Sequence, residues 1–174
     1  TTYAWTNNTT SIGLAASGTG NIAAFTATNT SNAPVTATIN VTPSANGCAG
    51  SPQTFTITVN PTPTVNSVAN QVLCVGSNTT TVNFASTFNV SGTTYAWTNT
   101  NTTIGLAASG SGNIASYATT LPTPFNVAQV GMVTVTPSAN SCPGTPQTFT
   151  YTVNPTPVIA AKAQTICTGT AFTI

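Results

Sequence analysis

Few side chains in this sequence could do chemistry: cysteine thiols, one lysine and many hydroxyls. The chain has no Asp, Glu or His, and its single basic side chain is Lys162. General acid–base catalysis at neutral pH usually depends on the three missing residue types, as do Ser–His–Asp and Cys–His arrangements. A Ser–Lys pair could use Lys162, but this lysine lies in a segment typical of a solvated linker. We therefore expect no catalytic residue and no cofactor, and the chain is predicted not to be an enzyme.

The cysteines are better suited to disulfides than to a metal. No two of them form the close C-x-x-C pair that is typical of a zinc site. The sequence offers no carboxylate for Ca²⁺ and no imidazole for Zn²⁺. We expect no metal site, and we expect disulfides of the kind that form in an oxidising compartment. The four cysteines are Cys48, Cys74, Cys142 and Cys167.

The composition also excludes two classes of partner. Charged residues make up 1% of the chain, against roughly 25% in an ordinary globular domain. One lysine does not supply the basic stripe that nucleic-acid binding needs. No apolar run approaches the ~20 residues of a transmembrane helix. We therefore expect neither nucleic-acid binding nor membrane insertion.

The sequence repeats itself. TTYAWTNNTTSIGLAASGTGNIAAF begins at Thr1 and recurs at Thr93 as TTYAWTNTNTTIGLAASGSGNIASY. A second block, VTPSANGCAGSPQTFTITVNPTP from Val41, recurs from Val135. The offset of 92 to 94 residues is about the size of one Ig-like β-sandwich. After the second copy, QTICTG matches the earlier QVLCVG, so Cys167 corresponds to Cys74.

The motif NPTP, at residues 60–63 and 154–157, predicts the boundaries between repeats. Proline cannot continue a central strand and stiffens a linker. Residues 1–63 are then the C-terminal part of a first Ig-like repeat, residues 64–157 a complete second repeat, and residues 158–174 the N-terminal strands of a third. Such short linkers predict repeats arranged end to end in an extended rod.

Alternation of apolar and polar residues predicts the fold class. Thr, Val, Ile, Tyr and Phe favour strands, and a period of two indicates strands with one buried face. The predicted class is all-β, with tandem antiparallel Ig-like sandwiches joined by short Pro-containing linkers. The Gly-rich segments SGTGN and SGSGN are interpreted as hairpin turns. In the complete repeat, strands are expected at residues 71–75, 80–84, 94–98, 104–107, 114–118, 132–136 and 147–153. The residues expected in the core are Trp5, Tyr95, Trp97, Val133, Val135 and Phe149.

With these motifs, the repeat resembles the PKD-like and Ig-like repeats of giant surface proteins of gliding Bacteroidota. The resemblance rests on TYAWT, on VTPSANGC with PQTFTITVNPTP, and on QVLCVG at the start of the next repeat. It covers essentially the whole chain. The PKD domain itself has a WDFGDG-type motif after its tryptophan, whereas Trp97 is followed by TNTNTT, so the similarity is to the divergent members. It implies secretion by the type IX system, display on the outer cell surface, and a role in adhesion and gliding.

An Ig-like topology predicts how the cysteines pair. The first strand of such a sandwich is expected to start at the end where the last two strands turn. Cys74, which is taken to open the first strand, is therefore predicted to bond with Cys142, in that turn. The rival pair, Cys48 with Cys74, would have to span a strand and a linker at ~3.3 Å per residue, which is too far for a disulfide. Cys48 and Cys167 are expected to have partners beyond the residues of this sequence.

Three functions are compatible with these observations. The first is a structural stalk or filament whose partners are neighbouring repeats of the same chain. The second is a module that itself binds surface polysaccharide, and the third is a spacer in a large secreted enzyme. Near-identical repeats favour the stalk, because nothing distinguishes one copy as a site. An aromatic cluster exposed on every repeat would favour the binding module, but Tyr95 and Trp97, like Tyr3 and Trp5, are expected in the core.

Overall fold

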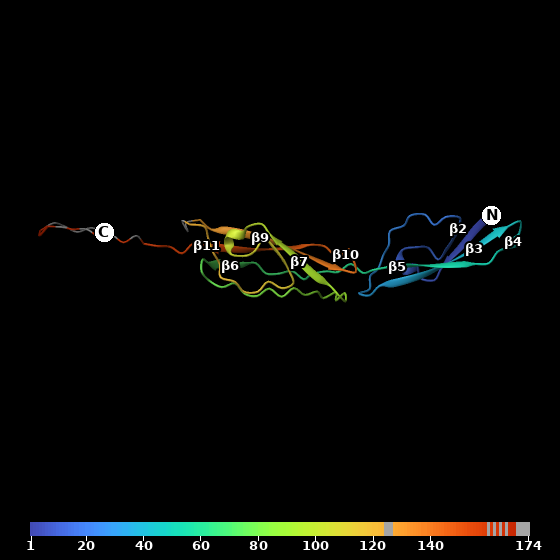
Figure 1. Ribbon diagram of the computed structural model, residues 1–174, viewed down its shortest axis with the longest axis horizontal. Coiled ribbons are helices and arrows are strands. Elements are labelled where there is room, and N and C mark those ends of the chain that lie inside the picture. Colours follow the sequence, from blue (N-terminus) through green and yellow to red (C-terminus); the bar gives the residue numbers. More distant parts are fainter. Residues whose placement is uncertain (124–126, 160, 162, 164, 166, 170–174) are drawn as a thin grey trace.

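The computed structural model describes residues 1–123, 127–159, 161, 163, 165 and 167–169. Its strands form two bodies that lie end to end along the long axis of the molecule (Figure 1). We call residues 1–63 the first unit and residues 64–157 the second unit. The predicted all-β class is confirmed, since the regular elements of the described residues are strands and two short 3-10 helices. Among these residues no helix is long and apolar enough to span a membrane.

The second unit is built on a six-stranded sheet in the order β6-β11-β9-β7-β8, with β10 paired to β9. All of its pairs are antiparallel except one, because β6 runs parallel to β11. Because β11 runs away from the turn that joins it to β9, the parallel strand β6 runs away from that turn as well. The strands are β6 (Gln71–Cys74), β7 (Thr94–Asn99), β8 (Ser109–Ser111), β9 (Gln129–Ala139), β10 (Cys142–Pro143) and β11 (Gln147–Asn154).

The first unit repeats this sheet without its β6 strand. The order is β2-β1-β3-β4, with β5 paired to β3. A 3-10 turn follows β1 at Thr10–Ile12, as another follows β7 at Thr102–Ile104. The strands are β1 (Thr2–Asn7), β2 (Ser17–Thr19), β3 (Val35–Ala45), β4 (Cys48–Ala49) and β5 (Gln53–Val59).

The core of the second unit lies between this sheet and an irregular second layer. Val133 and Val135 are fully buried on the inner face of β9, and Phe149, Tyr151 and Val153 on that of β11. The second layer is held by two isolated antiparallel bridges, Val82 with Ile114 and Asn78 with Ala118. Its buried side chains complete the sandwich and include Val65, Val82, Phe84, Ile114 and Leu121.

Three local predictions differ from the structure. Residues 80–84 and 114–118 form bridges in place of continuous strands. Residues 104–107 are no strand, because the chain closes a 3-10 turn at Ile104 and Gly105 then takes a φ of +97°, which interrupts an extended path. The SGSGN segment is mostly an edge strand, β8, and its turn is at Gly112.

The edge strand β8 allows the core tryptophan to pack closely against the backbone of the sheet. Trp97 pairs with Gly110 in the β7–β8 register, and its indole covers the glycine. A Cβ atom added to Gly110 would overlap ring atoms of Trp97. Gly18 and Trp5 have the same relation in the first unit. The Gly-rich sequence thus serves close packing of an aromatic ring against the backbone.

A buried asparagine beside this tryptophan ties the following loop to the sheet. The Asn99 amide donates to the carbonyl oxygens of Asn101 (2.9 Å), Leu106 (3.1 Å) and Ala107 (3.3 Å). Its Oδ1 accepts the Asn101 N–H at 3.1 Å. Because side-chain bonds satisfy these carbonyls, the loop can be irregular and still lie close to the core. Asn7 binds the equivalent loop in the first unit in the same way.

Gly110→Ala should destabilise the second unit by about 1–3 kcal/mol, because the new methyl group must displace a buried ring. Ser109→Ala, at an exposed neighbour on the same strand, should change the free energy of unfolding by less than ~0.5 kcal/mol. Urea unfolding followed by Trp97 fluorescence in a Trp5→Phe background measures both. Equal effects of the two substitutions would contradict the packing role of Gly110.

Two tyrosines with buried hydroxyls are the groups that make this fold sensitive to pH. Tyr151 and Tyr117 pack edge to face with ring centroids 5.5 Å apart, and both hydroxyls are buried without a hydrogen-bond partner among the described residues. Burial raises the pKa of Tyr151 from 10.0 to about 12. Burial, and then the charge of Tyr151, raises the pKa of Tyr117 further. The folded state therefore holds these protons at a pH where the unfolded chain releases them.

Stability should be nearly flat between pH 4 and pH 8, since the sequence has no Asp, Glu or His, and should fall above pH 10. Below pH 10 both states hold the tyrosine protons; between pH 10 and about 12 the unfolded state loses them first, so rising pH favours unfolding. Melting temperatures measured across this range under reducing conditions test the prediction. Tyr151→Phe should lessen the alkaline loss. A midpoint shift of more than about 10 °C between pH 4 and pH 8 would require an ionisable group that the sequence lacks.

Candidate functional site

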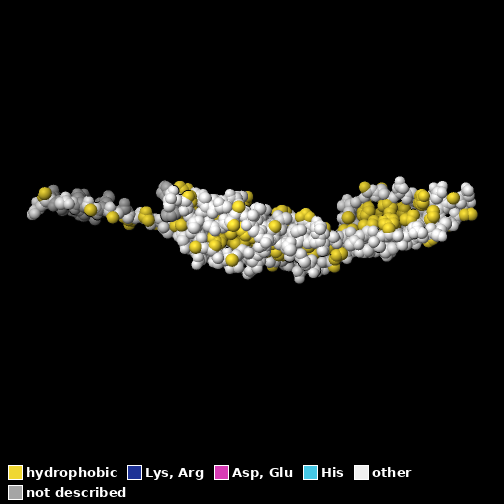
Figure 2. Space-filling view, in the orientation of Figure 1, with side chains coloured by type: hydrophobic (Ala, Val, Ile, Leu, Met, Phe, Trp, Pro, Cys, Tyr) yellow, Lys and Arg dark blue, Asp and Glu magenta, His cyan; other side chains and the backbone are white. Residues whose placement is uncertain are grey.

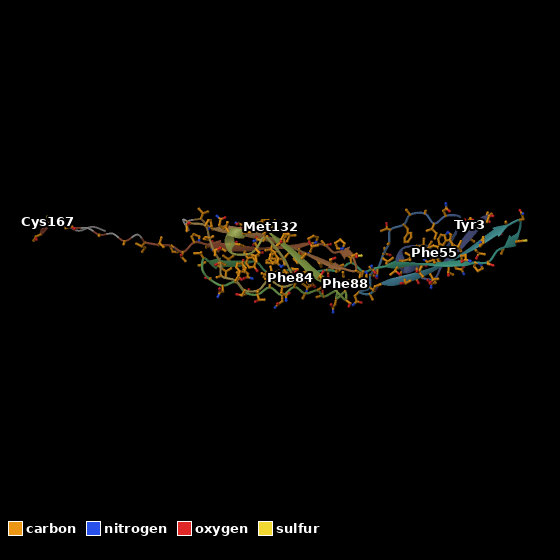
Figure 3. All side chains as sticks on the ribbon, viewed as in Figure 1. Tyr3, Phe55, Phe84, Phe88, Met132 and Cys167 are labelled. Carbon is orange, nitrogen blue, oxygen red and sulfur yellow. The ribbon has the colours of Figure 1, made fainter. Side chains whose placement is uncertain are left out.

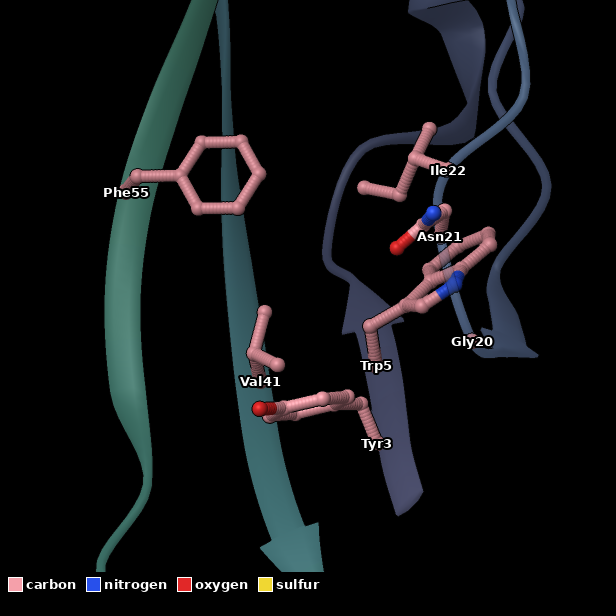
Figure 4. A pocket seen from close by; sticks show the side chains of 7 residues that line it. All are labelled: Tyr3, Trp5, Gly20, Asn21, Ile22, Val41 and Phe55. Atoms are coloured by element: carbon pink, nitrogen blue, oxygen red, sulfur yellow. The ribbon is translucent and has the colours of Figure 1, made fainter. Parts of the chain in front are cut away.

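An apolar hollow lies on the first unit. Its volume is about 580 Å³, and hydrophobic side chains gather in it on the surface (Figure 2). Figure 4 shows side chains from β1, β3, β5 and the loop after β2 facing the same space. The lining residues are Tyr3, Trp5, Gly20, Asn21, Ile22, Val41 and Phe55.

The sheet register brings these side chains together. Trp5 of β1 lies opposite Val41 of β3, and Phe55 of β5 lies opposite Ile39. Alternation along each strand places Tyr3 beside Trp5 on the same face. Tyr3 and Phe55, which extend from the first unit in Figure 3, are 48% and 45% exposed. The inner face of this sheet is therefore open to solvent at its aromatic centre.

The second unit contains the same residues, but there they are covered. Phe149, the counterpart of Phe55, is only 2% exposed. The Phe84 ring lies between the two sheet aromatics, with its centroid 5.6 Å from Tyr95 and 6.4 Å from Phe149. Tyr95 is half-buried, and Trp97 is 7% exposed. The hollow of the first unit is thus the place that a phenylalanine occupies in the second.

Backbone groups bind the covering segment as well. Val82 and Ile114 exchange backbone hydrogen bonds of 2.9 and 3.0 Å, and the Phe84 N–H donates to Asn113 Oδ1 at 3.0 Å. Asn21 and Ile22, the first-unit counterparts of Asn113 and Ile114, line the hollow. The hollow therefore offers backbone groups at a strand edge, the side-chain amide oxygen of Asn21, and an apolar space between aromatic rings. These groups suit an extended segment with the pattern Val-x-Phe.

The chemistry of this site is that of packing. Its lining contains no ionisable group other than the Tyr3 phenol. No cluster of three or more His, Cys, Asp or Glu residues occurs among the described residues. Lys162 lies outside the described residues. The absence of a catalytic site, a metal and a cofactor stays a prediction from the composition.

The predicted Cys74–Cys142 disulfide is wrong. Cys74 ends β6 level with Asn154, whereas Cys142 begins β10, just after the turn that follows β9, level with Ala139. The length of β9, eleven residues from Gln129 to Ala139, separates these levels, which at ~3.3 Å per residue is roughly 30 Å. A disulfide needs Cα atoms within about 7 Å, and both residues are thiols in the structure. The predicted direction of the first strand, away from the β9–β11 turn, agrees with the structure, because β6 runs parallel to β11. The error was the position of Cys74, which ends β6 and does not open it, and therefore lies far from the turn.

The rival pair is also separated. Cys48, in β4, lies at the outer end of the first unit, and β6 belongs to the second unit (Figure 1). Cys48 is an exposed thiol. The external partners predicted for Cys48 and Cys167 stay predictions.

Comparison with known families supports the fold assignment. Residues 1–63 match the family model of the PKD-like domain. A search of curated proteins finds no match to this chain. The all-β sheets and their layered core agree with a PKD-like, Ig-like sandwich, a type of module that is typically structural.

Attaching a copy of residues 64–92 in front of Thr1 should close the hollow, because that segment directly precedes Thr93, the counterpart of Thr1. The lengthened chain should no longer bind an environment-sensitive naphthalene sulfonate dye at the first unit, and that unit should unfold at a higher urea concentration. A copy with the Phe84→Ala change is the matched control and should lose about 3–5 kcal/mol of this gain. Undiminished dye binding by the lengthened chain would contradict the interpretation of the hollow as an uncovered core.

Proposed function

We propose that this chain is a segment of a structural stalk in a secreted cell-surface adhesin, built from tandem PKD-like repeats. The single observation that carries the proposal is the arrangement of the two sheets end to end, with their long axes along the molecule (Figure 1). In this arrangement each added repeat lengthens the molecule. A module whose purpose is to hold a distal adhesive tip away from a cell needs this property.

The contacts between the units support a junction that resists bending. The rings of Pro61 and Pro63 are fully buried, and proline restricts the backbone between them. The Asn60 amide donates to the Asn140 carbonyl of the second unit at 3.2 Å. The Asn32 amide donates to the Asn89 carbonyl at 3.3 Å. Neighbouring repeats of the same chain are thus the partners in this proposal.

The biological setting follows from the family resemblance. The repeats resemble those of the gliding-motility adhesin SprB of Bacteroidota, so we place the chain in an extracellular filament exported by the type IX system and attached to the outer membrane through other parts of the protein. The surface chemistry is compatible with this setting, since hydroxyl pairs such as Thr36 with Thr58 (2.9 Å) take the place of charges. An antibody against residues 64–157 should bind intact cells of the source organism; binding only after lysis would contradict surface display.

A polysaccharide-binding module is the less favoured alternative. A module of this kind is expected to expose an aromatic cluster on each repeat. Tyr3 and Phe55 are exposed on the first unit, but Phe84 covers Tyr95 and Phe149 on the second. A spacer in a large secreted enzyme would have the same end-to-end shape, and catalytic activity elsewhere in the whole protein would distinguish it.

Energy transfer between dyes on Cys48 and Cys74 measures the stiffness of the junction. These thiols lie in different units, and Cys142→Ser with Cys167→Ser leaves them as the labelling sites. Single molecules should give one narrow distribution of low transfer efficiency. The double substitution Pro61→Gly and Pro63→Gly should broaden the distribution and raise its mean, because the units then bend toward each other.

The matched control is Pro155→Gly with Pro157→Gly, the same change in the linker that lies beyond both dyes. It should leave the transfer distribution unchanged. High transfer in the unsubstituted chain would mean that the units fold back on each other, and the stalk proposal would then fail.

A further inference from the structure

The second unit has one cysteine at each of its two ends. Cys142, in β10, lies at the end that faces the first unit, and β6, which ends at Cys74, lies toward the opposite end (Figure 1). The Cys74 backbone is held firmly, since its carbonyl accepts from Thr119 Oγ1 at 2.9 Å and from the Ser77 N–H at 3.1 Å. Its thiol is exposed. The arrangement presents a thiol at each point where another repeat can adjoin.

The junction between the units shows what Cys142 faces. The turn that precedes it reaches the end of β5, where the Asn60 amide binds the Asn140 carbonyl. On the other side of Cys142, a Cβ atom at Gly144 would overlap the carbonyl of Pro63. Cys142 therefore lies between two residues that both touch the end of the first unit.

The sequence repeat identifies the residue of a complete first unit that would lie at the junction, next to Cys142. Asn60 corresponds to Asn154, because NPTP recurs with an offset of 94 residues. Asn154 is the residue that lies beside Cys74 in the parallel β6–β11 register, and its carbonyl accepts the Val75 N–H at 2.8 Å. A strand equivalent to β6 on the first unit would thus place its cysteine beside Asn60, at the strand spacing of about 4.8 Å.

We propose that the strand cysteine of each repeat forms a disulfide with the turn cysteine of the following repeat. At the junction of the two units, Cys142 bonds to the strand cysteine of the repeat that contains residues 1–63. At the other end, Cys74 bonds to the turn cysteine of the repeat that begins at residue 158. The inference rests on the proposed tandem array, and it adds a covalent link across every junction of the stalk.

The geometry suits such a bond. Cys142 is two residues from Asn140, and Asn140 touches Asn60, beside which the partner cysteine would lie. Both cysteines thus lie at the same junction, and the bond requires their Cα atoms to approach within the roughly 4.4–6.8 Å that disulfides span. Within one unit the same two types of cysteine are roughly 30 Å apart, so the bond links repeats and does not close a single repeat.

The bond forms by thiol–disulfide exchange with a small external disulfide such as oxidised glutathione. The two cysteine thiols lose two protons and two electrons, and one S–S bond forms between them. The external disulfide gains both electrons and both protons, its S–S bond breaks, and two thiols leave. A link of this kind would keep neighbouring repeats joined under tension even when the hydrogen bonds of the junction break.

A chain lengthened by one repeat tests the proposal. Residues 1–157 are followed directly by a second copy of residues 64–174, which continues the NPTP register. After oxidation with a glutathione mixture, free thiols are alkylated, and peptic peptides are analysed by mass spectrometry without reduction. We expect one cross-link, between Cys74 of the first copy and Cys142 of the second copy.

Single substitutions identify the copies. Cys74→Ser in the first copy, or Cys142→Ser in the second, should abolish the cross-link. The matched controls, Cys142→Ser in the first copy and Cys74→Ser in the second, should leave it at full yield. A cross-link that survives Cys74→Ser in the first copy, a Cys74–Cys142 bond within one copy, or complete alkylation of the folded chain would each overturn the proposal. The dye experiment above reports the stalk arrangement independently, so either result can fail alone.

Discussion

The structure depends on one constraint: the apolar inner face of each sheet must be covered by a second layer. In the second unit residues 64–92 supply much of that layer, and Phe84 lies on Tyr95 and Phe149. The first unit has the same sheet without this segment, and its Phe55 is 45% exposed where Phe149 is 2% exposed. The two units therefore show the same sheet with and without the segment that covers it.

The same order of segments makes the repeats propagate in a line. The covering segment and β6 come first in a repeat, and β11 comes last and runs parallel to β6. The chain therefore leaves the second unit at the end opposite the β9–β11 turn, and that turn meets the preceding unit through Asn140. A rod follows from strand direction together with a linker too short to fold back.

Much of this fold could be predicted from pattern alone. Strict alternation identified the inward faces of β9 and β11, where Val133, Val135 and Phe149 are buried. Pattern failed where a loop is held by side chains: at residues 104–107, Gly105 and the Asn99 amide override a strand-like composition. It also failed at Ser109–Ser111, because the glycine that indicated a turn is there to receive the Trp97 ring.

The sequence by itself determined the all-β class, the repeat and the lack of Asp, Glu and His, since period-two alternation, internal identity and missing residue types are local properties that need no coordinates. Only the tertiary structure decided which ends of the sheet hold Cys74 and Cys142, and that the hollow at Tyr3 and Phe55 is an uncovered core. The register in which β6 pairs with β11, and the segment that covers a sheet, are set by contacts between residues far apart in the chain. The sequence of a short strand is the same whichever part of its neighbour it pairs with, so composition and spacing carry no record of that choice.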